Sequence, residues 1–336
     1  MLKGKSVLVT GGTGSFGQKF VQRLLKDDEV SKVIVFSRDE LKQFEMQSDV
    51  NSPKLRYFLG DVRDFQRLKQ ATAGVDVIVH AAAIKQIAAA EYNPMEAIKT
   101  NIFGAENIIN VAIENNISKV IALSTDKAAN PANLYGATKL CSDKLMVAGN
   151  ILAGKRSVRF SVVRYGNVLG SRGSVIPFFK EQMKNGFLPI TDINMTRFWL
   201  TIDEGVQFVL DSLSRMHGGE IFVPKIPSFK VVDVATVISP NSPIKIIGIR
   251  PGEKLHEVMI TEDDSEYTLE FKDYYAILAP FLMNSSEYSS VGTKVPKGFS
   301  FNSENNKLWY NFDTFKKTLQ NAGLLNLFLI LSKAFK

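Results

Sequence analysis

A tyrosine and a lysine four residues apart could carry acid–base chemistry. If the segment that contains Tyr135 and Lys139 is helical, this spacing places both side chains on one face. A nearby ammonium group favours the charged form of a phenol and lowers the pKa of the tyrosine, which makes tyrosine a usable base near neutral pH. The hydroxyl of Thr125, upstream in the chain, could hold a substrate oxygen. Because Tyr-x-x-x-Lys also arises by chance, the surrounding elements decide its meaning.

A glycine-rich loop near the start of the chain predicts where a phosphate group binds. Gly11, Gly14 and Gly17 form a Gly-x-x-Gly-x-x-Gly pattern that follows a strand-like run and precedes an amphipathic segment. One glycine permits the tight turn, one lets the backbone approach the phosphate, and one lets the helix pack on the strand. The phosphate then lies at the positive end of the helix. We therefore predict a site for the pyrophosphate of a nicotinamide dinucleotide. The predicted contacts in this loop are Gly11, Thr13, Gly14, Ser15, Phe16 and Gly17.

The residues that follow the second predicted strand bear on which dinucleotide binds. Enzymes that use NAD usually place a carboxylate here against the ribose hydroxyls, whereas this chain presents Ser37 and Arg38 first. A hydroxyl and a guanidinium suit the 2′-phosphate of NADP, while an acid would repel it. The sequence therefore favours NADP, and the nearby Asp39 leaves NAD open. Further contacts along the adenine and the dinucleotide are expected at Asp61, Val62, Ala81 and Ala83.

The first half of the chain alternates short β-branched runs with longer amphipathic segments, which is typical of a Rossmann-type α/β fold. Strands are predicted at 7–10, 32–36, 55–59, 75–80, 119–123 and 159–164. Helices are predicted at 14–26, 63–71, 94–115 and 135–150. Continuous apolar strands imply helices on both faces, and parallel strands need crossovers of this length. We therefore predict a doubly wound parallel sheet with a smaller C-terminal substrate-binding domain.

Domain boundaries are predicted from a change of rhythm after Gly170, where the alternation becomes irregular and prolines become frequent. We expect an NADP-binding Rossmann domain over 1–170, whose sheet is completed by later segments. A smaller, mainly substrate-binding domain is expected over 171–280 and a C-terminal extension over 281–336. The apolar and basic end of that extension, 323–336, is expected to pack on the protein or on another subunit, with contact with a membrane surface as the alternative.

Composition and charge narrow the classes of function. The net charge is +7, but lysines and arginines are interleaved with acids and form no basic run with stacking aromatics, which argues against nucleic-acid binding. No apolar run approaches the roughly 20 residues of an integral membrane segment, and the start does not resemble a signal peptide. The single cysteine, Cys141, excludes an internal disulfide and a cysteine-based metal site. We therefore expect a cytoplasmic protein without a metal.

Six further segments, taken together with the glycine loop, carry a resemblance to a known family. They read SRDELKQ at 37–43, STDKA at 124–128, NLYGATK at 133–139, RYGNV at 164–168, MTRFW at 195–199 and RPGEKLHE at 250–257. The chain resembles the extended short-chain dehydrogenase/reductase superfamily and, within it, the inverting UDP-N-acetylglucosamine 4,6-dehydratases of the PseB type. The resemblance runs from the first strand to about Ala279.

This resemblance implies a reaction. UDP-N-acetylglucosamine would become UDP-2-acetamido-2,6-dideoxy-β-L-arabino-hex-4-ulose, through a tightly bound NADP that takes up and returns one hydride in each turnover. Tyr135, helped by Lys139, would take the proton of the 4-hydroxyl. Asp126 and Lys127 would remove the carbon-five proton and expel the carbon-six hydroxyl, with Lys127 as the base. A neutral lysine requires a pKa lowered by burial or by cationic neighbours.

Substrate contacts and further cofactor contacts are implied position by position. Substrate contacts are implied at Lys85, Asn167, Arg172, Ser174, Thr191, Arg197, Arg250 and Glu253. Cofactor contacts are added at Lys42, Lys85, Tyr135, Lys139 and Val168. Arginines suit the diphosphate, and the acid suits ribose hydroxyls. Relatives often carry proline at the position of Ala88, so the loop after Lys85 departs from the family pattern.

The resemblance also implies a biological context and leaves alternatives. It implies the first step of pseudaminic acid synthesis for flagellin glycosylation, and a homo-oligomer that is a dimer or a hexamer. A sugar-nucleotide 4-epimerase would keep the tyrosine and lysine without the pair formed by Asp126 and Lys127. A retaining dehydratase generally lacks the tyrosine. A dinucleotide-sensing regulator would predict a broken catalytic set, whereas every member is present in this chain.

Overall fold

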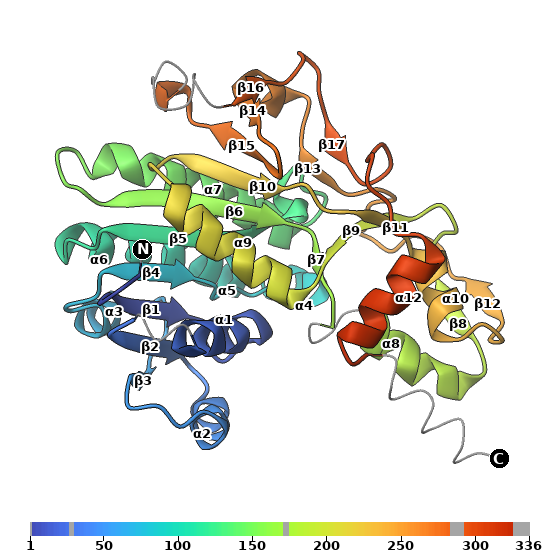
Figure 1. The fold of residues 1–336 in the computed structure, drawn as a ribbon, viewed down its shortest axis with the longest axis horizontal. Coiled ribbons are helices and arrows are strands. Elements are labelled where there is room, and N and C mark those ends of the chain that lie inside the picture. Colours follow the sequence, from blue (N-terminus) through green and yellow to red (C-terminus); the bar gives the residue numbers. More distant parts are fainter. Residues whose placement is uncertain (1, 27–29, 171–174, 283–291, 325–336) are drawn as a thin grey trace.

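The computed structural model describes residues 2–26, 30–170, 175–282 and 292–324. Within these ranges the largest element is a ten-stranded sheet in the order β16-β14-β15-β10-β6-β5-β4-β1-β2-β3 (Figure 1). The strands from β3 to β10 in this order run parallel. Their bounds are β1 Ser6–Thr10, β2 Lys32–Ser37, β3 Leu55–Leu59, β4 Val77–His80, β5 Lys119–Thr125, β6 Arg159–Tyr165 and β10 Glu220–Pro224.

The inner parallel strands are buried on both faces because helices cover both sides of the sheet, whereas the edge strand β3 is partly exposed. Every residue of β1 and of β4 is buried, as expected for continuous apolar strands between two helical layers. One layer holds α1 (Ser15–Lys26) and α9 (Ile202–Arg215), which pack together. The other holds α3 (Phe65–Ala71), α6 (Gly104–Glu114) and α7 (Leu134–Leu152). The predicted Rossmann-type doubly wound sheet is confirmed.

The helix predicted at 94–115 is interrupted in the structure. It divides into α5 (Pro94–Ile98), a π-helical turn η1 (Lys99–Phe103) and α6. The buried Asn101 lies in this wider turn, where its amide donates to the backbone oxygen of Ile84 and to Thr138 Oγ1, both at 2.9 Å. Its Oδ1 accepts from the backbone N–H of Ile84 at 2.8 Å. Because π turns bring a side chain out of the regular helical register, this one ties α6 to the loop that follows β4.

Two helices next to the predicted cofactor site were not expected from the sequence. The first, α2 (Glu40–Asp49), begins after Asp39, whose Oδ1 accepts from the backbone N–H of Lys42 at 3.0 Å. An aspartate in this position is a helix-start signal that could have revealed α2. The second, α4 (Ile87–Tyr92), occupies the loop in which Ala88 replaces the proline of relatives.

The sheet is completed by segments from the second half of the chain. An antiparallel extension follows β10 and consists of β15 (Tyr274–Leu278), β14 (Thr268–Glu270) and β16 (Thr293–Lys294). Residues 171–280 therefore contribute β10, β14 and β15 to the main sheet. They also contribute α9 to one of the helical layers that cover it. The short helical turns η4 (Asp263–Tyr267) and η5 (Pro280–Leu282) flank these antiparallel strands.

A smaller layer lies beyond the carboxyl ends of the parallel strands and has its own core (Figure 1). Trp199 stacks against Phe229 and Phe315, with ring centroids 4.4 and 5.0 Å away. The helix that carries Phe315 packs here although it comes from the predicted C-terminal extension. The elements of this layer are β7 Asn167–Val168, α8 Val175–Gln182, η3 Met183–Asn185, β8 Leu188–Ile190, β9 Thr196–Leu200, β11 Ser228–Lys230, α10 Val231–Ile238, β12 Ile244–Ile246 and α12 Phe312–Asn321. The short antiparallel pair of β13 (Val258–Ile260) and β17 (Phe301–Asn302) packs on the main core instead. Most of the tail at 323–336 lies outside the described residues. In the described ranges, no helix combines the length and the apolar character required to cross a bilayer.

Candidate active site

A cavity of about 1150 Å³ lies at the carboxyl ends of the parallel strands. Ligands of open α/β sheets bind at this edge, where the strand order reverses. The cavity extends from the glycine loop between β1 and α1 to Arg250, Pro251 and Glu253 in the smaller layer. Every residue predicted to contact the cofactor lines it, and so does every predicted catalytic residue.

The glycine loop has the shape of a phosphate cradle. Gly11 has a φ of +64° and donates its N–H to the backbone oxygen of Phe36 at 2.9 Å. A Cβ added to Gly17 would lie 2.5 Å from the Cα of Gly12, so only glycine lets α1 begin so close to the loop. The first turn of α1 contains no acidic residue. An anion is favoured at such a helix start, and the loop fits the pyrophosphate of a dinucleotide.

The charged groups after β2 are paired with one another at the wall of the cavity. Asp39 is engaged at the start of α2, where its carboxylate accepts from the backbone of Lys42 and forms a short ion pair with that side chain. Arg38 is half exposed and lies 3.5 Å from Asp61 through one guanidinium nitrogen. Burial opposes the charge of Asp61, but Arg63 and Arg38 together hold the pKa of this carboxyl below its ordinary value. Serine, arginine and lysine side chains, together with two carboxylates, therefore line the cavity beyond β2.

The candidate catalytic residues come from the end of β5 and the start of α7. Thr125 ends β5, and the single turn η2 (Asp126–Ala128) follows it directly. A Cβ added to Gly136 would lie 2.2 Å from the backbone oxygen of Lys127, so this glycine allows α7 to pack tightly against η2. Asn133 caps α7 by accepting from the N–H of Gly136 at 2.8 Å. These contacts hold the two segments, and therefore their functional side chains, in one arrangement.

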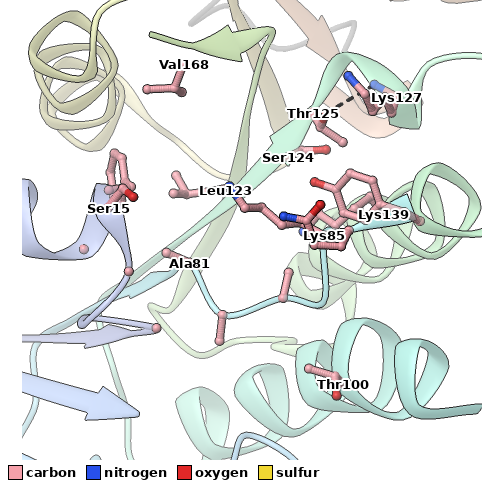
Figure 2. Close-up of a pocket in the computed structure, with 18 of the residues that line it drawn as sticks. Ser15, Ala81, Lys85, Thr100, Leu123, Ser124, Thr125, Lys127, Lys139 and Val168 are labelled. Atoms are coloured by element: carbon pink, nitrogen blue, oxygen red, sulfur yellow. Dashed lines mark hydrogen bonds between the residues drawn. The ribbon is translucent and has the colours of Figure 1, made fainter. Parts of the chain in front are cut away.

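Figure 2 shows how the side chains are distributed along the cavity. Thr125 and Lys127 lie at one end, and Lys85 and Lys139 are drawn below them. Ser15 lies toward the opposite side, at the glycine loop. The cavity can thus hold a dinucleotide along the loop with its far end directed at the lysines, which leaves room for a substrate beside Lys127.

Asp126 and Lys127 form a buried acid–base pair. Asp126 Oδ1 accepts from the Nζ of Lys127 at 3.0 Å and from the Oγ1 of Thr125 at 2.8 Å. The other oxygen of Asp126, Oδ2, is buried and has no hydrogen-bond partner among the residues that the structure describes. An acid with one satisfied and one unsatisfied oxygen, at the wall of a cavity, is suited to exchange a proton with a bound molecule.

The protonation of Lys127 differs from the sequence-based expectation. Burial lowers the pKa of this lysine, but the carboxylates of Asp126 and Glu257 outweigh burial, and the pKa lies above its ordinary value. Glu257 Oε1 is 3.4 Å from Lys127 Nζ. The expected lowering of the pKa is therefore wrong for this arrangement, because burial acts here together with two carboxylates. Lys127 is an ammonium at neutral pH.

The pKa of Tyr135 also differs from the sequence-based expectation. Burial raises its pKa to about 12, although the ammonium of Lys127 and a hydrogen bond with Thr125 oppose this rise. The ammonium that acts most on the phenol is thus Lys127 rather than Lys139. Burial lowers the pKa of Lys139, and the nearby carboxylate of Asp143 opposes that shift. Tyr135 is a neutral phenol at rest and becomes a base only when its proton has a favourable acceptor.

The predicted substrate residues divide into three groups. Lys85, Asn167, Arg250 and Glu253 line the cavity. Thr191 and Arg197 are not among its lining residues. Arg197 instead donates to the backbone oxygens of Thr196, Lys254 and Leu255, at 2.7, 2.9 and 3.1 Å, and so holds the loop before β13. Arg172 and Ser174 lie outside the described residues.

Three groups near the cavity were missed at the level of sequence. Glu257, buried beside Lys127, belongs to a segment whose resemblance was noted without a role for this residue. Asp143 Oδ2 accepts from the Oγ of Ser124 at 2.7 Å and from Arg164 at 3.2 Å, which links α7, β5 and β6 below Lys139. Glu91 accepts from the N–H of Leu134 at 2.7 Å and supports the start of α7. The one-turn spacing of Lys139 and Asp143 is the signal that could have revealed the second group.

Comparison of the sequence with known proteins gives consistent matches over most of the chain. The model of a family described as "Polysaccharide biosynthesis protein" matches residues 7–279. A Campylobacter jejuni protein named UDP-N-acetylglucosamine 4,6-dehydratase (inverting) is 57% identical over 318 residues, which are 92% of this chain and 95% of that protein. A Rickettsia conorii protein named UDP-glucose 4-epimerase is 41% identical over 285 residues, 82% of this chain and 84% of that protein.

Solved structures share the fold. Pen from Bacillus thuringiensis superposes with a TM-score of 0.89 at 34% identity, over 97% of this chain and all of that one. The dTDP-glucose 4,6-dehydratase DesIV from Streptomyces venezuelae, solved with NAD and TYD bound, has a TM-score of 0.66 at 24% identity, over 74% of this chain and 86% of that one.

Proposed function

The chain belongs to the polysaccharide biosynthesis protein family within the short-chain dehydrogenase/reductase superfamily, and on this premise we propose that it is an inverting UDP-N-acetylglucosamine 4,6-dehydratase. One observation carries the proposal: Asp126, Lys127 and Tyr135 line the same cavity as the glycine loop. A tyrosine without this pair could assist the oxidation of a sugar hydroxyl but not the loss of water. An acid and a base beside it are what elimination of water requires.

The chain's own residues supply the proton transfers of this reaction. In its phenolate form Tyr135 takes the proton of the sugar's 4-hydroxyl, and Thr125 orients the ring oxygen through their hydrogen bond. The ketone at carbon four then acidifies the hydrogen on carbon five. Lys127 removes that hydrogen after passing its own proton to Asp126, 3.0 Å away, and Asp126 delivers this proton to the leaving oxygen on carbon six. Inversion follows when carbon five regains a proton on its opposite face.

NADP is the cofactor that we propose for the cavity, where it would supply the hydride acceptor for carbon four and the hydride donor for carbon six. The glycine loop would hold its pyrophosphate, and Ser37, Arg38 and Lys42 its 2′-phosphate. Lys139, buried at the base of α7, would face the nicotinamide ribose. Lys85, Asn167, Arg250 and Glu253 would bind the sugar nucleotide, because all four line the end of the cavity near Lys127 or the smaller layer.

Replacing Arg38 with alanine tests the choice of NADP over NAD. We expect the affinity for NADP to fall about tenfold relative to that for NAD, since a half-exposed charge-assisted contact with the 2′-phosphate is lost. Titration calorimetry with both dinucleotides measures the two affinities. Arg156→Ala, which changes an exposed arginine that does not line the cavity, is the control. Equal losses for NADP and NAD would contradict the assignment.

A sugar-nucleotide 4-epimerase is the second candidate, because one relative at 41% identity carries such a name. Epimerisation needs the tyrosine and the dinucleotide but no acid–base pair for expelling water. The buried contact of Asp126 with Lys127 favours the dehydratase, since burying two charged groups is costly unless they are paired and used.

Product analysis distinguishes these candidates. The protein incubated with UDP-N-acetylglucosamine, without added NADP, is expected to form a product lighter by one water, as measured by mass spectrometry. No added cofactor is required because the reaction leaves the cofactor in its starting oxidation state. A product of unchanged mass with a galacto configuration would identify an epimerase and overturn the proposal.

The finer context follows the same resemblance. We propose that the product enters pseudaminic acid synthesis for flagellin glycosylation, and that the protein acts in the cytoplasm as a homo-oligomer. The single cysteine supports a reducing compartment. Sedimentation velocity of the purified protein would distinguish a dimer from a hexamer.

A further inference from the structure

Glu257 is a buried carboxylate that contacts the proposed base from outside the cavity. The residue is 2% exposed, and its Oε1 lies 3.4 Å from Lys127 Nζ. Unlike Asp126, it is not among the residues that line the cavity. Its second oxygen, Oε2, is buried without a hydrogen-bond partner in the described ranges. Burying an acid is costly unless it is paired, and the charged groups that face this one are Lys127 and Arg197.

The position of Glu257 is fixed by its surroundings rather than by Lys127. Its backbone N–H donates to Ser303 Oγ at 2.9 Å, and its carbonyl oxygen accepts from the N–H of Ser303 at 2.8 Å. Arg197 Nε lies 3.6 Å from Oε1, while the rest of that guanidinium is engaged with backbone oxygens. The backbone of Glu257 is therefore fixed independently of Lys127, and Arg197 faces its carboxylate together with that lysine.

The charged groups around this carboxylate come from η2, β9 and the segment that precedes β13. Asp126 and Lys127 lie on η2, and Arg197 lies on β9. Lys254 donates to the backbone oxygen of Ala129 at 2.7 Å and joins the same electrostatic cluster. The ammonium of Lys127 is thus held between two carboxylates, one at the cavity wall and one behind it.

We propose that Glu257 is a positioning residue that clamps the Lys127 ammonium from outside the cavity, so that the amine stays protonated and in place until Asp126 takes its proton. The proposal rests on the proposed function. An N–H bond of Lys127 breaks as an O–H bond of Asp126 forms. The C–H bond at carbon five then breaks as the amine takes up that proton. The electron pair of the broken C–H bond forms the double bond between carbons five and six. The proton of Asp126 leaves with the carbon-six oxygen as water.

Replacing Glu257 with glutamine removes the outer charge and keeps the shape. Because an opposite charge nearby favours the protonated amine, its loss lowers the pKa of Lys127. At one mildly alkaline pH the fraction of neutral amine then rises about tenfold. We therefore expect reductive methylation of Lys127 to become about tenfold faster in E257Q. The rate is measured by peptide mass spectrometry relative to the exposed Lys297 of the same molecule.

A second variant, expected to change the methylation rate of Lys127 in the opposite direction, keeps the test valid even if E257Q does not fold. Arg197 opposes the protonation of Lys127, so Arg197→Gln leaves Glu257 less compensated and is expected to slow methylation of Lys127. Glu257→Asp keeps the charge and should react closer to wild type than E257Q does. The control is Glu304→Gln, an exposed acid in the neighbouring segment. A residue that only supports the backbone would leave the relative methylation rate unchanged in all four variants.

Turnover provides the second measurement. In E257Q we expect kcat to fall about tenfold, because the amine is no longer held in place against Asp126 although more of it is neutral. KM should change by less than about twofold, since Glu257 does not line the cavity. Wild-type protein that forms no dehydrated product would overturn the proposed function itself. Wild-type protein that forms it, together with unchanged methylation of Lys127 in both E257Q and Arg197→Gln, would overturn only the role of Glu257.

Discussion

Lys127→Met is expected to lower the formation of dehydrated product by about 10² to 10⁴, the range typical of losing a general base. Methionine has a similar length but cannot take the proton from carbon five. The oxidation at carbon four depends on Tyr135, which this substitution leaves in the cavity. We therefore expect the reduced form of the bound nicotinamide to accumulate after substrate is added, as followed by its absorbance in a single turnover.

The same substitution also lowers the stability of the folded protein, so the Tm of the variant is measured together with its activity. Without the ammonium, Asp126 and Glu257 are left close together and buried, and removing one partner of a buried ion pair costs on the order of 3 kcal/mol. A lower Tm is expected, with the cofactor still bound. Lys297→Met, which changes an 89% exposed lysine, is the control and should keep full activity. Undiminished turnover by a folded Lys127→Met variant would remove this lysine from the mechanism.

Tyr135→Phe is expected to lower product formation by a similar factor, but at an earlier step. The phenol is the group that takes the proton of the 4-hydroxyl, and phenylalanine keeps the ring while removing the acid–base group. Reduced nicotinamide should then fail to accumulate, in contrast to Lys127→Met. Stability should change little, because the hydroxyl's assigned partner is the single hydroxyl of Thr125.

The comparison of the two variants assigns each residue to its step. Tyr267→Phe, which changes a tyrosine outside the cavity, is the matched control for the loss of a phenol. If Tyr135→Phe accumulated reduced nicotinamide as readily as Lys127→Met, the oxidation would not depend on the phenol, and the assignment of the two roles would be wrong.

Sequence patterns were sufficient where local physics determines the structure. Apart from the partly exposed edge strand β3, the strands β1 to β6 are short apolar runs that a doubly covered sheet buries. All six were predicted within a few residues of their bounds. The loop from Gly11 to Gly17 was predicted for the same reason, since its glycines are required by close backbone contacts. Cavity residues next to these elements, such as Thr125 and Tyr135, followed from their positions at strand and helix ends.

Sequence patterns were insufficient where distant segments meet. Nothing local indicates that Glu257 returns to Lys127, or that Arg197 binds backbone oxygens rather than lining the cavity. The antiparallel return of β14 and β15 to the main sheet is likewise a long-range pairing. The protonation of Lys127 was mispredicted because its pKa is raised first by Asp126, the preceding residue, and then by Glu257, a carboxylate from another part of the chain.

The most direct test of the proposed function is proton NMR of the product formed from UDP-N-acetylglucosamine in deuterated water. Removal of the carbon-five hydrogen by Lys127, followed by return of a solvent proton to the opposite face, predicts deuterium at carbon five and the L-arabino configuration. A product that retains protium at carbon five, or that keeps the configuration of the substrate there, would contradict the account.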